Sequence, residues 1–398
     1  MSRVCFTLRY IFQSYSDLDV RINCDENLWC LKRTLAAPDA YPSLLARISS
    51  IALFTEVLPL DGLWLTTSKA QLLSFWTKYI ISAFLRNAPC MPRLHTAIFS
   101  RIIVDKEHLE LLFHSRSLHT LVLGFCGFRG MAPRTPSHIR HLEMRYMEDM
   151  NPFLGHCSPN LETLLLTCPW QMPGSTRLPL FPKLRKLVFG RPMNQLNTLI
   201  SLAPQLEYLE LLGSGERHHW RLVIPASVNY LTIEGMPNFG TGPFLHFHHL
   251  HLKHVSHRSI TPFIQLVFPN LTSLELDISG SFRNFTLLLA RALPNVTRLK
   301  LDIWGTYPRD DCDTSDIVET PVGRLSSLYV NVSNTSRGKD YTKSYEDWIL
   351  HTVFPPTVGL GGPHLREVDV VFSRGSNSIP SVWWYWKRVE KEWFFEKY

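Results

Sequence analysis

The residues best suited to chemistry form a histidine-rich run, His246-Phe-His248-His249-Leu-His251-Leu-Lys-His254, with His257 beyond it. Alternation along an extended chain would place His249 and His251 on one side, where two imidazoles could share a divalent cation. A metal site needs three or four ligands, and neither cysteine nor carboxylate occurs at a matching spacing nearby. We therefore expect no metal site and no cofactor, and interpret the run as exposed histidines whose protonation below pH ~6.5 tunes an interface.

The sequence contains none of the common catalytic motifs that would support an enzyme. The sequence has no G-x-S-x-G, no P-loop, no G-x-G-x-x-G after a strand and no H-E-x-x-H. Aspartate and histidine are plentiful, but they are spread along the chain without converging on an evident closed pocket. We expect a non-catalytic protein.

The elements that must position these residues are marked by a recurrent phrase, P-x-L-x-x-L-x-L. Its clearest copies are Pro204 to Leu211 and Pro269 to Leu276. Other copies run from Pro159 to Leu166, Pro182 to Phe189, Pro294 to Leu301 and Pro363 to Val370. Looser copies are Pro92 to Phe99, Leu118 to Leu123, Ile139 to Met144, Val228 to Ile233, Phe247 to Leu252 and Leu325 to Val330.

The spacing of these copies predicts a repeat architecture. Their first apolar residues are 94, 118, 139, 161, 184, 206, 228, 247, 271, 296, 325 and 365, so successive steps are 24, 21, 22, 23, 22, 22, 19, 24, 25, 29 and 40. Most steps fall in the leucine-rich-repeat range of roughly 20 to 29 residues. Each x-L-x-L is a short strand that cannot bury its apolar side alone, so the units must stack into a solenoid.

The segments before the phrases carry apolar residues at helical spacing and end at a proline, where helices usually stop. Examples are Asn194 to Ala203, Ile260 to Phe268 and Phe285 to Leu293. We therefore expect an α/β fold in which a parallel, curved sheet has helices on its outer side.

Function in such an array is expected on the exposed, concave face of the strands, where the residues flanking the leucines point outward. We predict that this face binds a partner through His141, Glu143, Arg145, Tyr208, Glu210, Tyr230, Glu234, His249, His251, Lys253, Glu275, Asp277, Arg298, Lys300 and Asp302. Thr232, Ser273, Glu367 and Asp369 fall on the same side. Charge of both signs along this row suits a particular protein surface better than a polyanion.

The positions of the P-x-L-x-x-L-x-L copies divide the chain into three parts. Residues 1–40 do not fit it and are expected to cap the array; residues 41–372 form the array, with an early strand at Ile48 to Leu53 and insertions at 304–323 and 333–362. The insertions are either partner sites or spacers. Residues 373–398 hold four tryptophans, and the spacing of 386, 389 and 393 predicts an aromatic helix that caps the last repeat or docks a partner.

The N-terminal passage resembles one found in fungal F-box proteins. Arg3-Val-Cys5, Tyr15 to Val20, Leu31 to Pro38 and the Ile48 to Leu53 strand look like the passage that joins an F-box to its leucine-rich repeats. The later phrases are similar to the irregular, ribonuclease-inhibitor-like repeats of that family. The resemblance implies a substrate-recognition subunit of an SCF-type ubiquitin ligase, which binds a Skp-type adaptor and a cullin through an F-box.

The sequence departs from that family at its start, because Met1 falls inside what would be the end of the F-box. Either the preceding exons are missing, or the protein kept the repeats and lost the adaptor module; in the second case it is a free-standing leucine-rich-repeat scaffold. Adaptor and cullin are therefore expected as partners only if an F-box lies upstream.

Composition and charge bear on three further questions: nucleic-acid binding, membrane insertion and cellular location. A formal charge of +7 invites a nucleic-acid partner, but lysines and arginines are scattered and form no basic block, so we expect none. The sequence contains no run of about 18 apolar residues, the length that would predict a membrane-spanning helix. The eight cysteines include no C-x-x-C pair, which is typical of buried thiols in a reducing compartment, whereas five Asn-x-Ser/Thr sequences argue weakly for a secreted protein. No signal peptide is evident at the N-terminus, and we expect a cytoplasmic or nuclear location.

Overall fold

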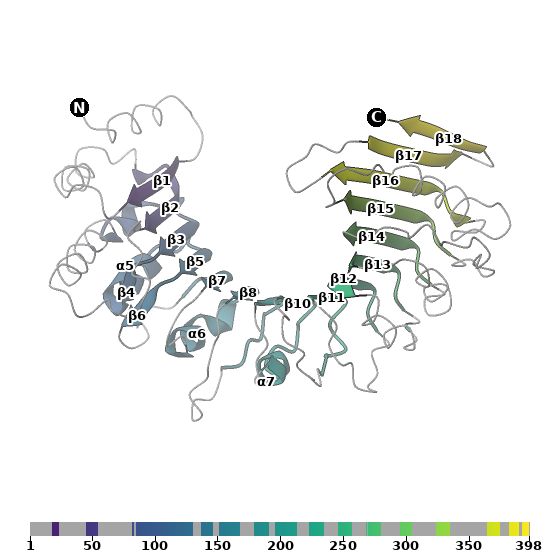
Figure 1. Cartoon of the computed structure of the whole chain (residues 1–398). Coiled ribbons are helices and arrows are strands. Elements are labelled where there is room, and N and C mark those ends of the chain that lie inside the picture. The colour runs from purple at the N-terminus through teal and green to yellow at the C-terminus, as the bar shows by residue number, and fades with distance from the viewer. Residues whose placement is uncertain are drawn as a thin grey trace, which may run out of the picture. The chain divides into compact units, whose positions relative to one another are not determined.

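The computed structural model describes residues 18–23, 45–54, 82, 85–129, 137–145, 151–167, 179–190, 196–212, 223–234, 246–256, 268, 270–279, 295–304, 324–334, 364–374, 382–389 and 392–397. The chain forms two compact units, Met1–Leu206 and Glu207–Tyr398, and each is described by itself. In both units the strands of the main sheet follow one another in sequence order (Figure 1).

The first unit contains a run of parallel strands. These are β1 (Leu18–Asn23), β2 (Ile48–Phe54), β3 (Thr96–Ser100), β5 (Thr120–Gly124), β7 (His141–Arg145), β8 (Thr163–Leu166) and β9 (Lys186–Phe189). Two short strands, β4 (Ile103–Asp105) and β6 (Gly127–Arg129), pair with each other in a separate sheet. The strand β1 lies within residues 1–40, the segment expected to be a cap or the remnant of the end of an F-box, and it pairs with β2 as the first strand of the sheet.

The second unit continues the same pattern and then changes direction. Its parallel strands are β10 (Tyr208–Leu211), β11 (Tyr230–Glu234), β12 (His249–Ser256), β13 (Ser273–Ser279), β14 (Arg298–Trp304), β15 (Ser327–Asn334) and β16 (Glu367–Arg374). The last two, β17 (Val382–Val389) and β18 (Glu392–Lys397), are antiparallel to their neighbours.

Every copy of the recurrent phrase ends in one of these parallel strands, as the alternation of its apolar residues predicts. In β13, for example, Leu274 and Leu276 are fully buried, while Glu275 between them faces the opposite side and remains partly exposed. Parallel sheets are usually covered on both sides and then read as continuous apolar runs. The alternation in β13 leaves one side of this strand polar and partly open to solvent.

A repeated backbone arrangement fixes the register of neighbouring strands. The carbonyl of His248 accepts hydrogen bonds from the amides of Thr272 and Ser273, each at 3.0 Å. The carbonyl of Thr272 in turn accepts from the amides of Thr297 and Arg298, at 2.8 and 3.1 Å. Because one carbonyl holds two amides of the next strand's start, corresponding residues are brought side by side across the sheet.

Within the described residues, α-helices occur in the first unit. They are α5 (Lys106–Phe113), α6 (Asn151–Cys157) and α7 (Leu196–Ser201), with short 3₁₀ turns at η2 (Ala88–Cys90) and η3 (Ser158–Asn160). The α7 helix confirms the helical reading of Asn194 to Ala203 and ends before Pro204. The helices expected at 260–268 and 285–293 and most of both insertions lie outside the described residues. No helix within the described ranges is long and apolar enough to span a membrane.

The expected C-terminal helix is wrong, because residues 382–389 and 392–397 form the antiparallel strands β17 and β18 instead. The strand β16 would otherwise present unpaired backbone groups at its free side, and β17 pairs with them. Alternation along β17 buries Trp384 and Trp386, whose rings meet edge to face at 5.8 Å. Aromatic and β-branched residues favour strands, and this preference outweighs the helical spacing on which the expectation rested.

Candidate functional site

The open side of strands β10 to β15 carries a continuous set of polar and aromatic side chains, which we call the polar face. Its members lie between the buried leucines of each strand: Tyr208, Glu210, Tyr230, Thr232, Glu234, His249, His251, Lys253, Ser273, Glu275, Asp277, Arg298, Lys300, Asp302, Ser327, Tyr329 and Asn331. The whole set belongs to the second unit. The parallel register therefore orders these side chains in rows that cross the strands.

Two rows define the middle of the polar face. Residues paired in the first row are Tyr208, Tyr230, His249, Ser273, Arg298 and Ser327; those in the second are Glu210, Thr232, His251, Glu275, Lys300 and Tyr329. Residues in successive rows are two apart in sequence and point to the same side. Each side chain thus has neighbours from both adjacent strands and from the adjacent row.

Glu275 is the centre of an ion-pair network on this face. Its carboxylate lies 3.7 Å from His249 Nε2, 3.7 Å from His251 Nδ1 and 3.5 Å from Lys300 Nζ. Lys300 also lies 3.3 Å from Asp302, so its ammonium is shared by two carboxylates. The network joins three consecutive strands and compensates the charge of Glu275.

The environment of these groups changes their proton affinities. Burial lowers the pKa of His249 below its usual value, and the Glu275 carboxylate only partly opposes this. Burial alone would lower the pKa of Lys300, but the carboxylates of Asp302 and Glu275 raise it above its ordinary value. His249 therefore favours its neutral form, whereas Lys300 keeps its charge.

A pair of carboxyl groups lies beside this network. Asp277 and Asp302 face each other across β13 and β14. Burial would raise the pKa of Asp277, but the proximity of His251, whose Nε2 lies 3.5 Å from Asp277 Oδ1, brings it below its ordinary value. Burial raises the pKa of Asp302, although the Asn331 amide donates a 3.0 Å hydrogen bond to it.

Aromatic rings extend the network at both ends. Tyr230 contacts Tyr208, with ring centroids 6.3 Å apart, and His249, at 5.5 Å. On the other side, the ammonium of Lys300 lies 5.8 Å from the ring centroid of Tyr329. The polar face therefore combines charged groups with aromatic groups, and among them tyrosine and arginine are residue types enriched in protein interfaces.

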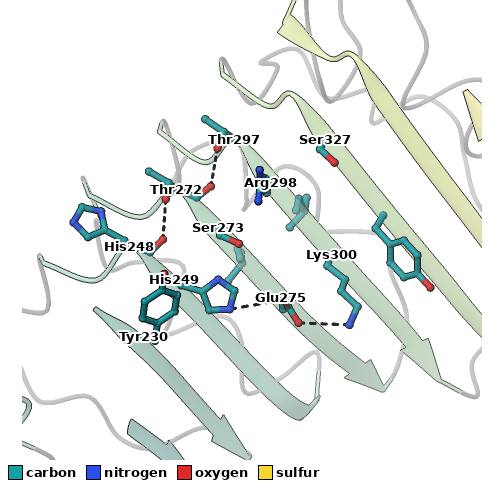
Figure 2. A pocket seen from close by; sticks show the side chains of 13 residues that line it. Tyr230, His248, His249, Thr272, Ser273, Glu275, Thr297, Arg298, Lys300 and Ser327 are labelled. Atoms are coloured by element: carbon teal, nitrogen blue, oxygen red, sulfur yellow. Dashed lines mark hydrogen bonds and ion pairs between the residues drawn. The ribbon is translucent and has the colours of Figure 1, made fainter. Parts of the chain in front are cut away.

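The polar face is hollowed across strands β11 to β15, as Figure 2 shows. The hollow has a volume of about 540 Å³ and is lined by Tyr230, His248, His249, Thr272, Ser273, Leu274, Glu275, Thr297, Arg298, Leu299, Lys300, Ser327 and Tyr329. The hydroxyls of Thr272 and Thr297 are engaged with the carbonyls of His248 and Thr272, at 3.0 and 3.1 Å. These hydrogen bonds link the backbone segments that precede β12, β13 and β14 along one edge of the hollow.

Most of the partner-binding residues predicted from the sequence lie on the polar face, and five of them line the hollow. These are Tyr230, His249, Glu275, Arg298 and Lys300. His141, Glu143 and Arg145 lie on β7 in the first unit, where Arg145 pairs with Glu143.

Five further polar or aromatic lining residues were missed by the sequence prediction: His248, Thr272, Thr297, Ser327 and Tyr329. The alternation in Leu325 to Val330 contains the signal for Tyr329, because that residue stands between Leu328 and Val330. The two threonines lie before their strands, where alternation gives no guidance.

The histidine run does not assemble a metal centre in the part of the chain that is described. No group of three or more histidine, cysteine or carboxylate side chains converges there with the geometry of a cation site. His249 and His251 do share one side of β12, but both face Glu275, which Lys300 also engages. In comparisons with known proteins, neither a protein-family model nor a curated protein matches this chain.

Proposed function

We propose that this chain is a leucine-rich-repeat solenoid of the irregular, ribonuclease-inhibitor-like kind, and that it binds a partner protein on the polar face. The regular steps between phrases, each ending in a parallel strand, support the architecture. The proposal for the partner rests on one observation: a side of five neighbouring strands carries paired charges, aromatic rings and a hollow instead of an apolar surface that other elements would cover.

The composition of the polar face fits recognition of a specific protein surface. Charges of both signs alternate over short distances, so a partner must match their order, whereas a polyanion would require a field of one sign. The tyrosines at either end of the hollow supply contact area with little loss of conformational freedom. Non-catalytic binding accounts for these features without any reacting group.

Site-specific crosslinking tests this proposal. A photoreactive phenylalanine analogue would replace Tyr230 or Tyr329, which line the hollow, or the exposed Leu180 of the first unit as a control. In lysate from a fungal cell, we expect both tyrosine positions to capture the same protein and the Leu180 position not to capture it. Capture should be lost when Lys300→Glu reverses a charge on the face. Equal capture at all three positions, or none at either tyrosine, would contradict the proposal.

The resemblance to fungal F-box proteins extends the proposal to a ubiquitin ligase. In that case the bound partner is a substrate, and a Skp-type adaptor and a cullin bind through an F-box upstream of Met1. The test is a tagged chain, with and without an F-box extension, purified from a fungal cell and measured by quantitative mass spectrometry. Adaptor and cullin with either form support the ligase; their absence from both favours a scaffold that binds partners without a ubiquitin link.

A further inference from the structure

The hollow in the polar face contains one cation for which the described residues provide no counter-ion. Arg298 lies at the start of β14 and is exposed. Its row neighbours on the two adjacent strands are Ser273 and Ser327, which carry hydroxyls and no charge. Among the described side chains, Arg298 forms no ion pair with a carboxylate.

Lys300 and Glu275, the other two charged residues that line the hollow, form an ion pair, and Lys300 also contacts Asp302, which is not part of the lining. Glu275 is compensated by Lys300, at 3.5 Å, and is also close to His249. These contacts hold Glu275 in the second row, while Arg298 belongs to the first. The lining residues of the hollow therefore carry two cations and one carboxylate, an excess of one positive charge, and Figure 2 shows Arg298 between the strands that carry Ser273 and Ser327.

The shape and lining of the hollow suit a side chain more than an extended surface. Its volume of about 540 Å³ holds one long side chain together with its flanking backbone. Tyr230 and Tyr329 lie at its two ends, on β11 and β15. Hydroxyls from Ser273 and Ser327 are placed to donate hydrogen bonds to an acceptor held by Arg298.

We propose that the hollow binds the carboxylate of an aspartate or glutamate side chain in an acidic segment of the partner protein, with Arg298 as its counter-ion. This inference rests on the proposed function and specifies what the polar face recognises. A guanidinium pairs with a carboxylate through two parallel hydrogen bonds. One negative charge matches the surplus of one positive charge, whereas a phosphate, with a charge of about −1.5 to −2, would exceed it and face Glu275.

Peptide pools test the proposal directly. The full chain would be immobilised and offered degenerate synthetic peptides in which one central position is fixed as Glu, Asp, Gln, Lys or phosphoserine. We expect the Glu and Asp pools to be retained about tenfold more strongly than the Gln pool, as for a partly exposed charge pair at an interface. The preference should vanish in Arg298→Gln and persist in Arg366→Gln, an exposed arginine that directly precedes β16 and does not line the hollow.

The results separate this inference from the proposed function. Equal retention of Glu and Gln pools, or an acidic preference that survives in Arg298→Gln, overturns the inference while leaving protein binding by the face intact. Stronger retention of the phosphoserine pool than of the Glu pool assigns the hollow to phosphate and overturns the carboxylate. Retention of no pool also overturns it, and the crosslinking at Tyr230 and Tyr329 then decides the proposed function by itself.

Discussion

Lys253 on β12 reaches across an entire strand to Glu210 on β10, with Nζ and Oε1 2.8 Å apart. On the intervening strand β11, Thr232 is the residue paired with Glu210, and it is buried. A small side chain at that position leaves room for the lysine to pass over it. The tyrosine hydroxyl of Tyr208 donates a second hydrogen bond to Glu210, at 3.1 Å. The network of the polar face thus continues beyond directly paired strands.

A double-mutant cycle should detect the coupling of Glu210 with Lys253. Both side chains are largely shielded from water, so we expect Glu210→Gln and Lys253→Met to show a coupling free energy of about 1 kcal/mol in urea unfolding, decreasing with salt. The pair Arg140 and Glu162 in the first unit is a suitable control, because its atoms are 3.8 Å apart and both side chains are more exposed. A coupling for Glu210 and Lys253 no larger than the control would show that the bridge contributes nothing to stability.

His249 should make stability depend on pH below its ordinary titration range. Burial lowers the pKa of the folded side chain below 6.5, so the unfolded chain takes up a proton at a pH where the folded chain does not. This contribution is complete above pH ~6.5 and is lost as the pH falls towards the lowered pKa. We expect wild type to lose more stability between pH 7.5 and 5.5 than His249→Gln, measured by urea midpoints. Identical losses in the two proteins would refute this role.

Three described cysteines should differ sharply in reactivity. Burial raises the pKa of the Cys126 thiol to about 11 and that of Cys157 to about 12, whereas Cys90 is exposed. Because the thiolate is the reactive form, N-ethylmaleimide at pH 7.5 should label Cys90 in the native protein and reach the two buried thiols only in denaturant. Peptide mass spectrometry with and without urea measures this. Native labelling of Cys157 at the rate of Cys90 would contradict the burial.

Two glycines of the first unit should respond oppositely to alanine. A Cβ on Gly190 would lie 2.5 Å from the Cα of Thr167, a backbone atom that cannot move aside, so Gly190→Ala should destabilise by about 1–3 kcal/mol. Gly155 lies in α6 with no atom within 4 Å of the added carbon, so Gly155→Ala should be neutral or stabilise by up to about 1 kcal/mol. Urea unfolding compares them. Equal stability of both variants would show that the close approach of residues 167 and 190 is not maintained.

The parallel strands could be predicted because their signal is local and strong. Alternating apolar residues such as Leu274 and Leu276 specify both the strand and the buried side, and any polar residue between them is then assigned to the open side. The same logic identified Glu275 and Lys300 correctly as residues of one face. It gave no distances between them, because the register that brings them together depends on backbone hydrogen bonds between segments far apart in sequence.

Alternation fails where the backbone departs from it. In β12 the register slips between Leu252 and Val255, and His254 adopts a left-handed conformation with φ of 53°. Simple alternation would bury His254 and expose Val255, but the bulge reverses this: the His254 side chain is 65% exposed and Val255 is fully buried. No glycine at residues 252–256 indicates such a bulge, so the sequence could not predict which side chains of this segment lie on the polar face.

The shared-carbonyl register between strands has a further consequence for how the chain can change in length. Lys300 meets Glu275 across a separation of 25 residues, and Asn331 meets Asp302 across 29, yet both contacts join directly adjacent strands. Spacing on the face is set by the separation of strands, about 4.8 Å, and not by the number of residues that connect them. Insertions and deletions between strands can therefore accumulate during evolution while the recognition geometry stays constant.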